Sequence, residues 1–315
     1  MTVIESGTVL ITGPTRGMGR ALTLEMAGRP APHRPDLLLV GRPGQALTEV
    51  AATARAAGAT AREIPCDLSR LADVRAAAAA ALDLLAAGAV RPLRALVANA
   101  GVMTANTRVA SADGYEMTFA VNYLAHAQLI GDLLGSFTAP ARIVFLGSNT
   151  YRGNLARRMI GAPGAQWRDP VDLARPATGG KSSGLHAAAV AYATSKLTIL
   201  YYAHELQRHA GDGIGVSVFE PGFMPGTGLP RRQGPAVRAL ARALAHLPGM
   251  PSPSGSASAL ASVVLDDRWA RLRDGAFVLR DKEIKVEPWA HDRDRERTLW
   301  EATTGLLERA ALAGT

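Results

Sequence analysis

Along the first two-thirds of the chain, short apolar runs alternate with segments of helical periodicity, and this alternation constrains the fold more than any other feature. The runs are almost continuous in Val, Ile, Leu and Ala, as in Asp36–Val40 (DLLLV) and Ala141–Leu146 (ARIVFL). Such runs predict parallel strands that are buried on both faces by the intervening helices. Right-handed crossovers then give an α/β fold with a doubly wound parallel sheet, in which ligands bind beyond the carboxyl ends of the strands.

We expect these elements to form one domain over residues 1–315. The expected strands, about seven by this pattern, are Thr8–Thr12, Asp36–Val40, Ala61–Pro65, Leu93–Ala98, Ala141–Leu146, Gly215–Phe219 and Ala276–Leu279. The expected helices are Gly17–Ala27, Ala46–Ala57, Ser69–Ala87, Tyr115–Leu134, Ala188–Arg208 and a terminal helix over residues 292–312.

Two segments interrupt the alternation. Residues 149–187 form an insert, and residues 223–256 surround a short helical piece, Ala236–His246; both segments are rich in Gly and Pro. Loops of this length in compact domains are usually functional, and together they can form a lid over a small-molecule substrate. Trp167 and Phe223 point to an apolar or aromatic substrate. The segments also carry arginines, which we interpret as solvated surface rather than as partners of an anionic substrate; they are Arg152, Arg157, Arg158, Arg168, Arg231 and Arg232.

Composition excludes several classes of function. The net charge is +8, but all except four of the 35 Lys and Arg residues are arginine, and no basic run is interleaved with aromatics, so we expect no nucleic-acid partner. Cys66 is the one cysteine, which excludes an intrachain disulfide and a cysteine-based metal site; we expect no metal. The N-terminal residues lack a signal-peptide pattern, and the Ala-rich stretch Ala76–Ala89 is too short to span a bilayer. These features predict a cytoplasmic protein.

A glycine-rich turn follows the first expected strand. It reads Thr12-Gly13-Pro14-Thr15-Arg16-Gly17-Met18-Gly19. Glycines let the backbone approach a phosphate closely, and the N-terminus of the next helix supplies free N–H groups. A lone glycine cluster also occurs in ordinary tight turns, but its position between strand and helix favours a dinucleotide site.

The residues after the second expected strand suggest which dinucleotide binds. NAD-binding proteins typically place Asp or Glu there, whereas an arginine accommodates the 2′-phosphate of NADP. This chain has Gly41-Arg42 at that point, and Arg16 offers a second cation in the glycine turn. We therefore expect NADP(H), with two solvated arginines as the alternative.

Two further polar groups follow strands three and four. Asp67, with Leu68, either contacts the adenine or caps the next helix together with Ser69, and the sequence does not decide between these. Asn99-Ala100-Gly101 supplies small residues where the chain would run close to a cofactor.

Tyr192 and Lys196 lie one helical turn apart after the insert. A tyrosine has an ordinary pKa of about 10, and a neighbouring ammonium favours the phenolate. Tyr192 can then act as general acid and base toward a carbonyl oxygen. Ser148, after the fifth expected strand, can hydrogen-bond the same oxygen, and Asn122 would complete a proton path through water. A Tyr–Lys pair alone is often an ordinary helix face; the ordered set of motifs makes the catalytic interpretation the better one.

The ordered motifs TGPTRGMG, CDL, NAG, VNYL, IVFLGS, YATSK and EPG resemble the short-chain dehydrogenase/reductase family over about residues 8–229. The resemblance implies a Rossmann-like fold, an NADP(H)-dependent oxidoreductase and a catalytic tetrad of Asn122, Ser148, Tyr192 and Lys196. The implied cofactor-binding residues, which include Tyr192 and Lys196, are otherwise Gly13, Thr15, Arg16, Gly17, Met18, Gly19, Arg42, Asp67, Leu68, Asn99, Ala100, Gly101, Pro221, Gly222, Phe223 and Thr227.

Within the family, VNYLAHAQL and PGFMPGTGL are most similar to the retinol dehydrogenase and protochlorophyllide reductase side. The protochlorophyllide enzymes carry a cysteine directly after this Pro-Gly, whereas this chain has Phe223. We therefore expect carbonyl or alcohol chemistry, with reduction of a C=C bond and non-catalytic NADP(H) binding as alternatives. The oligomeric state stays open between monomer and homodimer.

Overall fold

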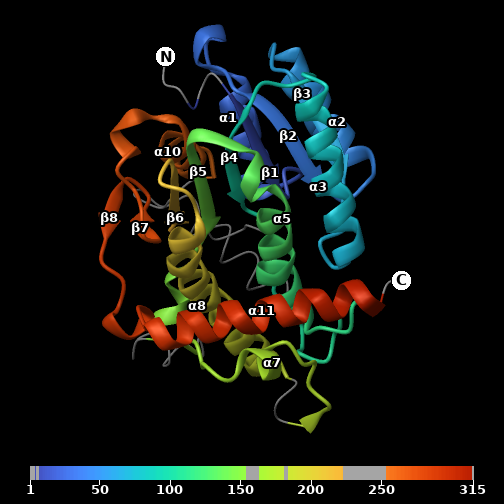
Figure 1. The fold of residues 1–315 in the computed structure, drawn as a ribbon, viewed down its shortest axis with the longest axis vertical. Helices are drawn as coiled ribbons and strands as arrows, with labels where there is room; N and C mark the ends of the chain where they lie inside the picture. The colour runs from blue at the N-terminus through green and yellow to red at the C-terminus, as the bar shows by residue number, and fades with distance from the viewer. Residues whose placement is uncertain (1–3, 5–6, 154–162, 181–183, 223–252, 314–315) are drawn as a thin grey trace, which may run out of the picture.

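The computed structural model describes residues 4, 7–153, 163–180, 184–222 and 253–313. Its centre is an eight-stranded sheet in the order β3-β2-β1-β4-β5-β6-β7-β8 (Figure 1). All neighbouring strands are parallel except β7 and β8. The strands are β1 Thr8–Thr12, β2 Asp36–Gly41, β3 Ala61–Pro65, β4 Leu93–Ala98, β5 Phe137–Leu146, β6 Ile214–Glu220, β7 Ala276–Leu279 and β8 Lys282–Ile284.

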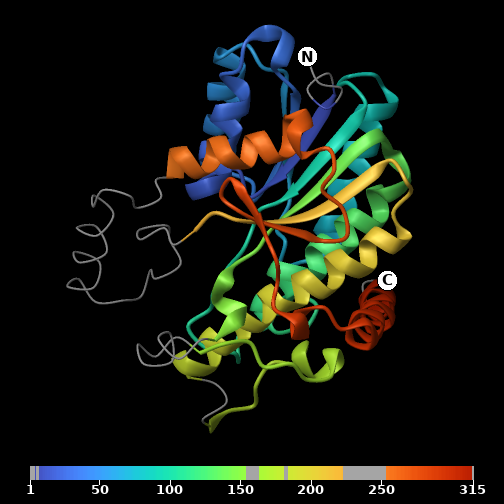
Figure 2. The same cartoon turned by 90° about the vertical axis from the view of Figure 1, so that its left-hand side faces the viewer.

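Helices cover both faces of the sheet, because side chains alternate between the faces along each strand. Val9 and Ile11 of β1 pack into one apolar cluster and Leu10 into the other. Figure 2 shows α10 beside α1 on one face and α8 on the other. The first face carries α1 Gly17–Ala27, α2 Gln45–Ala56 and α10 Pro253–Leu265. The second carries α3 Leu71–Ala86, α5 Ala125–Leu133 and α8 Leu185–His209.

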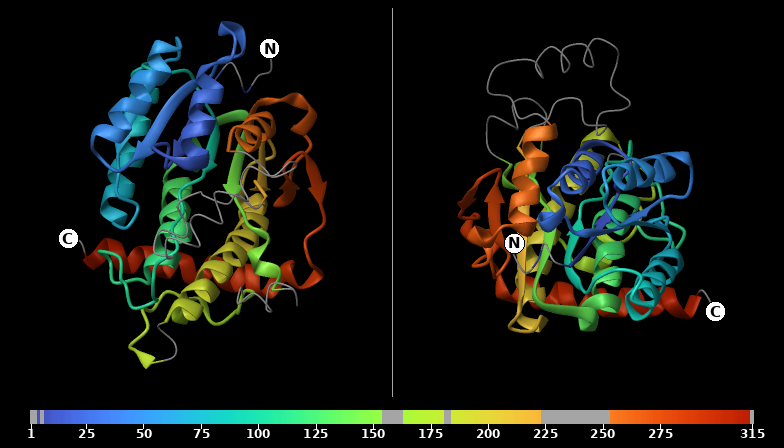
Figure 3. Two further views of the ribbon diagram at one scale, coloured as in Figure 1. Left: turned by 180° about the vertical axis from the view of Figure 1, so that it is seen from behind. Right: turned by 90° about the horizontal axis from the view of Figure 1, so that it is seen from above.

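The C-terminal helix α11, Arg293–Ala313, is a third layer. It crosses the outside of α8 and reaches α3 (Figures 1 and 3). The side chains of Leu299 and Leu306, which belong to α11, are buried. No helix in the described part of the chain is both long and apolar enough to cross a membrane.

The predicted fold class is confirmed, and the seven expected strands are present. The structure adds β8, which has only three residues and so carries no detectable alternation. It also adds α10, which begins at Pro253, inside the segment expected to be a lid. The expected helix Ala236–His246 lies outside the described residues. In the insert, the structure describes a turn at Asn149–Arg152 and a short helix α7, Pro170–Leu173.

The expected helix Tyr115–Leu134 is broken into pieces. A short α4, Met117–Phe119, is followed by a π-helical stretch, Ala120–Leu124, and then by α5. A π-helical turn widens the helix by one residue per turn and often marks a functional position. Asn122 lies in the middle of this stretch.

Candidate active site

The glycine turn follows β1, at the point in the sheet where the order of the strands reverses. Strand β1 pairs with β2 on one side and β4 on the other. Doubly wound sheets bind ligands beyond the carboxyl ends of such strands. Gly13 has a positive φ of 64°, and a Cβ on Gly19 would lie 2.1 Å from the carbonyl oxygen of Gly13. Only glycine fits this close approach of the backbone to itself.

Asn99 fastens this turn from the end of β4. Its Nδ2 donates hydrogen bonds to the carbonyl oxygens of Thr12 at 2.8 Å and Gly13 at 3.1 Å. The N–H groups of Asn99 and Ala100 both donate to Thr12 Oγ1 at 3.0 Å. Asn99 was predicted to border a cofactor; the structure shows its side chain hydrogen-bonded to the glycine turn, and the cofactor contact stays a prediction.

No sequence signal marked the hydroxyl of Thr12 or the ring of His126, which complete this arrangement. Thr12 Oγ1 lies 2.9 Å from His126 Nε2, and His126 Nδ1 lies 3.1 Å from the carbonyl oxygen of Asn122. Burial lowers the pKa of His126 to about 4, with the charge on Lys196 acting in the same direction and the hydrogen bond to Asn122 opposing it. The ring is therefore neutral, so Nδ1 donates to Asn122 and Nε2 accepts from Thr12. These bonds join the glycine turn to the π-helical stretch.

The remaining predicted cofactor residues are distributed along the same edge of the sheet. Gly17 and Met18 begin α1, and the Arg16 and Arg42 side chains are exposed after β1 and β2. Asp67 accepts hydrogen bonds from the N–H and hydroxyl of Ser69 at 3.0 and 2.9 Å. The N-cap of α3 is Arg70, so Asp67 does not cap that helix, and its contact with adenine stays a prediction. Thr15, Leu68, Ala100, Gly101, Pro221 and Gly222 lie in the loops that follow β1, β3, β4 and β6. Phe223 and Thr227, and with them most of the expected lid, lie outside the described residues.

Tyr192 and Lys196 lie on α8, as predicted. Lys196 Nζ is 5.6 Å from the centroid of the Tyr192 ring and donates a 2.8 Å hydrogen bond to the carbonyl oxygen of Leu146. Lys196 is 5% exposed. Burial lowers its pKa to about 8, and the negative charge of Glu220 opposes that shift. A lysine with this pKa is mostly an ammonium at neutral pH.

Asn122 connects the end of β4 to α8. Its Oδ1 accepts from the Val102 N–H at 2.7 Å, and its Nδ2 donates to the Val102 carbonyl at 3.0 Å and to Ser195 Oγ at 3.0 Å. A Cβ on Gly101 would lie 3.4 Å from Asn122 Oδ1 and 3.9 Å from Lys196 Nζ. Asn122, Gly101 and Lys196 are therefore immediate neighbours, although 95 residues separate the last two.

Ser148 lies two residues beyond Leu146, the residue that binds Lys196, so the fourth predicted member stands at the same end of β5. Its hydroxyl accepts from the Thr150 N–H at 3.4 Å. Trp167, from which an apolar or aromatic substrate was predicted, is partly exposed and packs edge-on against Tyr201 with ring centroids 4.9 Å apart. The substrate class stays a prediction.

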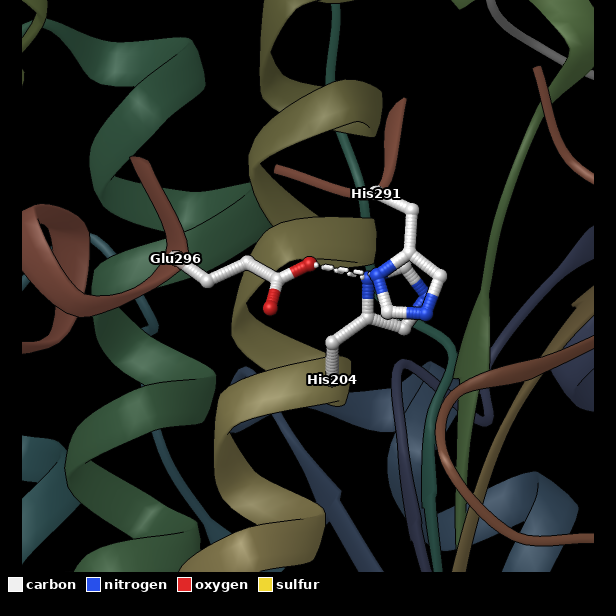
Figure 4. Close-up of side chains that lie close together, drawn as sticks. All are labelled: His204, His291 and Glu296. Atoms are coloured by element: carbon white, nitrogen blue, oxygen red, sulfur yellow. Dashed lines mark hydrogen bonds and ion pairs between the residues drawn. The ribbon is translucent and has the colours of Figure 1, made fainter. Parts of the chain in front are cut away.

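A second cluster of ionisable groups lies away from this edge, where α8 and α11 meet (Figure 4). Glu296 Oε1 accepts from His204 Nδ1 at 2.8 Å and His291 Nδ1 at 3.0 Å, and Arg208 bonds to the other carboxylate oxygen. These are metal-binding residue types. However, the Arg208 guanidinium already pairs with the Glu296 carboxylate, and its positive charge disfavours a second cation at this place. We assign the cluster to the attachment of α11.

Comparisons with known proteins agree with the fold and the motifs. A family model described as short chain dehydrogenase matches residues 7–158. A polyprenol dehydrogenase of Mus musculus is 32% identical over 307 residues, covering 92% of this chain and 81% of its own. A chloroplastic protochlorophyllide reductase A of Triticum aestivum is 29% identical over 327 residues, covering 96% of this chain and 81% of its own.

Solved structures extend the agreement to three dimensions. A short chain dehydrogenase from Burkholderia cenocepacia J2315, in complex with NADP, superimposes with a TM-score of 0.63 at 21% identity, covering 88% of this chain and 97% of its own. One from Burkholderia phymatum, in complex with NAD, has a TM-score of 0.56 at 25% identity, covering 89% and 90%. The chain belongs to the short-chain dehydrogenase/reductase family and is an oxidoreductase.

Proposed function

We propose that the protein is an NADP(H)-dependent oxidoreductase that interconverts a carbonyl group and the corresponding alcohol in a small molecule. The buried Lys196 ammonium, 5.6 Å from the centroid of the Tyr192 ring, carries the proposal. A cation beside a phenol stabilises the phenolate. Tyr192 can therefore donate its proton to a substrate oxygen during reduction and remove one during oxidation.

Ser148 and Asn122 support this step in different ways. Ser148 is proposed to hydrogen-bond the substrate oxygen and so hold it against the Tyr192 hydroxyl. Asn122 is proposed to border a path through water along which Tyr192 recovers its proton. An amide does not titrate, and that of Asn122 is fixed by Val102 and Ser195, so Asn122 shapes this path rather than carrying the proton.

The open space at the glycine turn supports the proposed binding of a dinucleotide. A Cβ on Gly17 would meet no atom within 4 Å, so the space above the N-terminus of α1 is open to a phosphate group. When bound, the nicotinamide supplies or accepts the hydride. Gly13, Gly17 and Gly19 would border the phosphates, and Lys196 would also hold the nicotinamide ribose.

The preference for NADP(H) rests on Arg16 and Arg42. No carboxylate directly follows β2, where an NAD-binding protein typically has one. Both arginines are exposed near the carboxyl ends of β1 and β2, where a 2′-phosphate would be bound. A planar guanidinium matches phosphate geometry well.

Reduction of a C=C bond is the second candidate function, because the similarity to protochlorophyllide reductase A covers 96% of this chain. The protein lacks a cysteine after Pro221-Gly222. Its one cysteine, Cys66, follows β3, and burial raises the pKa of its thiol to about 12, with the charges of Asp73 and Asp67 acting in the same direction. Cys66 is therefore a poor proton donor at neutral pH, and this favours carbonyl chemistry.

The test is turnover of ketones, aldehydes and alcohols with NADPH or NADP⁺, and with NADH or NAD⁺ in parallel. We expect NADP(H) to be the better cofactor. Tyr192→Phe should reduce turnover by about 10²- to 10⁴-fold, as expected for loss of a general acid, and should leave the Kd for NADPH nearly unchanged. An α,β-unsaturated ketone in the panel separates an allylic alcohol product from a saturated ketone.

Tyr201→Phe is the matched control, because Tyr201 lies on the same helix and its hydroxyl donates to the carbonyl of Trp289. It should retain turnover. Equal activity of Tyr192→Phe and the parent would refute the role of Tyr192. Tight NADPH binding without turnover of any panel member would instead support a non-catalytic NADP(H)-binding protein.

A further inference from the structure

Glu220 is a buried carboxylate at the carboxyl end of β6, directly before Pro221 and Gly222. It is 5% exposed. A buried carboxylate is costly unless hydrogen bonds and charges compensate for the lost hydration. The partners of Glu220 therefore indicate what it does.

Two backbone N–H groups on different loops donate to this carboxylate. The Asn149 N–H donates to Oε2 at 2.5 Å and the Gly222 N–H to Oε1 at 3.2 Å. Asn149 follows Ser148, and Gly222 belongs to the loop expected to border the nicotinamide. One side chain therefore connects the loop of the proposed catalytic serine to the proposed cofactor loop.

The turn after Ser148 is attached through the side chains of Tyr151 and Arg152, which reach Glu287 and Lys285, but less well through its first two residues. Asn149 Oδ1 and Thr150 Oγ1 are buried and have no hydrogen-bond partner among the described residues. Ser148 reaches the Thr150 N–H only at 3.4 Å. The hydrogen bond from Asn149 to Glu220 is thus the shortest polar contact of this turn among the described residues.

Glu220 also lies next to the residues that hold Lys196. Leu146, which accepts from Lys196 Nζ, pairs in register with Phe219, the residue directly before Glu220. The charge of Glu220 acts on the Lys196 ammonium, which no carboxylate contacts directly among the described residues. The other titratable groups near this ammonium are Tyr192 on α8 and the neutral His126 on α5. Glu220 is therefore the one anion among the described groups that stabilises the charged form of Lys196.

We propose that Glu220 is a positioning residue with two tasks: it holds the Ser148 loop against the Pro221–Gly222 loop, and it supplies the counter-charge for the Lys196 ammonium. The second task rests on the proposed function of Lys196. Glu220 acts through these neighbours and needs no contact with substrate.

The first measurement is a titration of Lys196 by NMR with isotope-labelled lysine. The chain has only four lysines, and Lys196→Arg assigns the signal. We expect Lys196 to titrate near 8 in the parent and about one unit lower in Glu220→Gln, because loss of a nearby anion favours the neutral amine. Glu205→Gln, a control on the outer part of α8, should leave this titration unchanged. An unchanged Lys196 titration in Glu220→Gln overturns the counter-charge role, whether or not the protein turns over any substrate.

The second measurement separates the two tasks through the pH profile of reduction. In Glu220→Gln, kcat should fall by about 10- to 100-fold, as expected for loss of a charged hydrogen bond, and its alkaline limb should move to lower pH. Glu220→Asp keeps the charge but shortens the side chain, so kcat should fall while the limb stays in place. If kcat falls in Glu220→Gln but the alkaline limb of its pH profile does not move, Glu220 has only a structural role and its role as counter-charge is refuted.

The third measurement is amide hydrogen exchange at Asn149 and Gly222. Both amides should exchange faster in Glu220→Gln and at the parental rate in Glu205→Gln. Parental exchange at both positions in Glu220→Gln overturns the loop attachment. Because neither exchange nor the lysine titration needs turnover, an inactive parent would count against the proposed function without deciding on Glu220.

Discussion

At the scale of single residues, the proposed cofactor loop is held by a few small polar groups whose hydrogen-bonding positions are all occupied. Thr12 Oγ1 accepts from two N–H groups and donates to the neutral His126, so its three hydrogen-bonding positions are filled. Asn99 uses its amide N–H groups on the two carbonyls of the turn. Because every group is satisfied in one geometry, the turn is held in one shape before any ligand binds.

Gly19 gives the sharpest test of this geometry. In Gly19→Ala, the new Cβ would lie 2.1 Å from the Gly13 carbonyl oxygen and 2.4 Å from Asn99 Nδ2, and backbone cannot yield as a flexible side chain does. We expect a loss of about 1–3 kcal/mol in the free energy of unfolding, typical of overpacking, and weaker NADPH binding. Chemical denaturation and fluorescence titration measure the two effects.

Gly131→Ala is the matched control for this prediction. Gly131 is an exposed glycine in α5, and a Cβ there would meet no atom within 4 Å. Removing a helical glycine should stabilise the protein by roughly 0.5–1 kcal/mol. If Gly19→Ala were as stable as Gly131→Ala, the close approach of Gly19 to the Gly13 carbonyl would be refuted.

At the scale of elements, the apolar runs in the sequence predicted most of the sheet, because parallel strands that are buried on both faces consist of nearly continuous apolar residues. Leu93–Ala98 and Thr8–Thr12 match the observed strands to the residue. These runs did not predict the π-helical stretch around Asn122, since that break depends on tertiary contacts of Asn122 with Val102 and Ser195. A role for Glu220 was not predicted for a similar reason. Its partners at Asn149 and Gly222 are backbone N–H groups, and almost any residue type would supply these, so the sequence does not mark them.

The attachment of α11 has a predictable pH dependence. Glu296 is fully buried; burial raises its pKa, but hydrogen bonds and charges from His204 and Arg208 outweigh this and bring the pKa to about 2. Because the pKa is lower in the folded state than the unfolded value of about 4.3, the stabilisation is present above that value. It is lost as the pH falls toward 2.

We therefore expect Glu296→Gln to unfold with about 3–5 kcal/mol less free energy at neutral pH, as when one partner of a buried ion pair is removed. The difference from the parent should narrow as the pH falls below about 4, since protonation removes the same charge from the parent. Denaturant unfolding at several pH values measures both. Glu301→Gln, exposed on the same helix, should behave as the parent; a constant difference across pH would contradict the assigned role of Glu296.

At the scale of the whole molecule, α11 determines which surfaces of the outer helices stay exposed. Trp300 stacks on Tyr202 with centroids 5.4 Å apart and on His209 at 4.1 Å. Tyr115 and Tyr123 also hydrogen-bond to α11, at the Leu306 carbonyl and Thr303. Residues of α8 from Ala193 to Gln207 are all buried, so α11 covers an outer face that would otherwise be free for a second subunit.

We accordingly predict a monomer. In the described part of the chain, the large exposed apolar side chains belong to different elements and are few: Leu82, Val109, Leu185, Trp289 and Leu312. A stable dimer usually buries about 800 Å² per partner around an apolar centre, and these scattered side chains do not provide one. Light scattering coupled to size-exclusion chromatography should give a mass near 33.0 kDa across a range of protein concentrations. A mass of twice that value, stable on dilution, would mean that subunits meet through a surface other than the one that α11 covers.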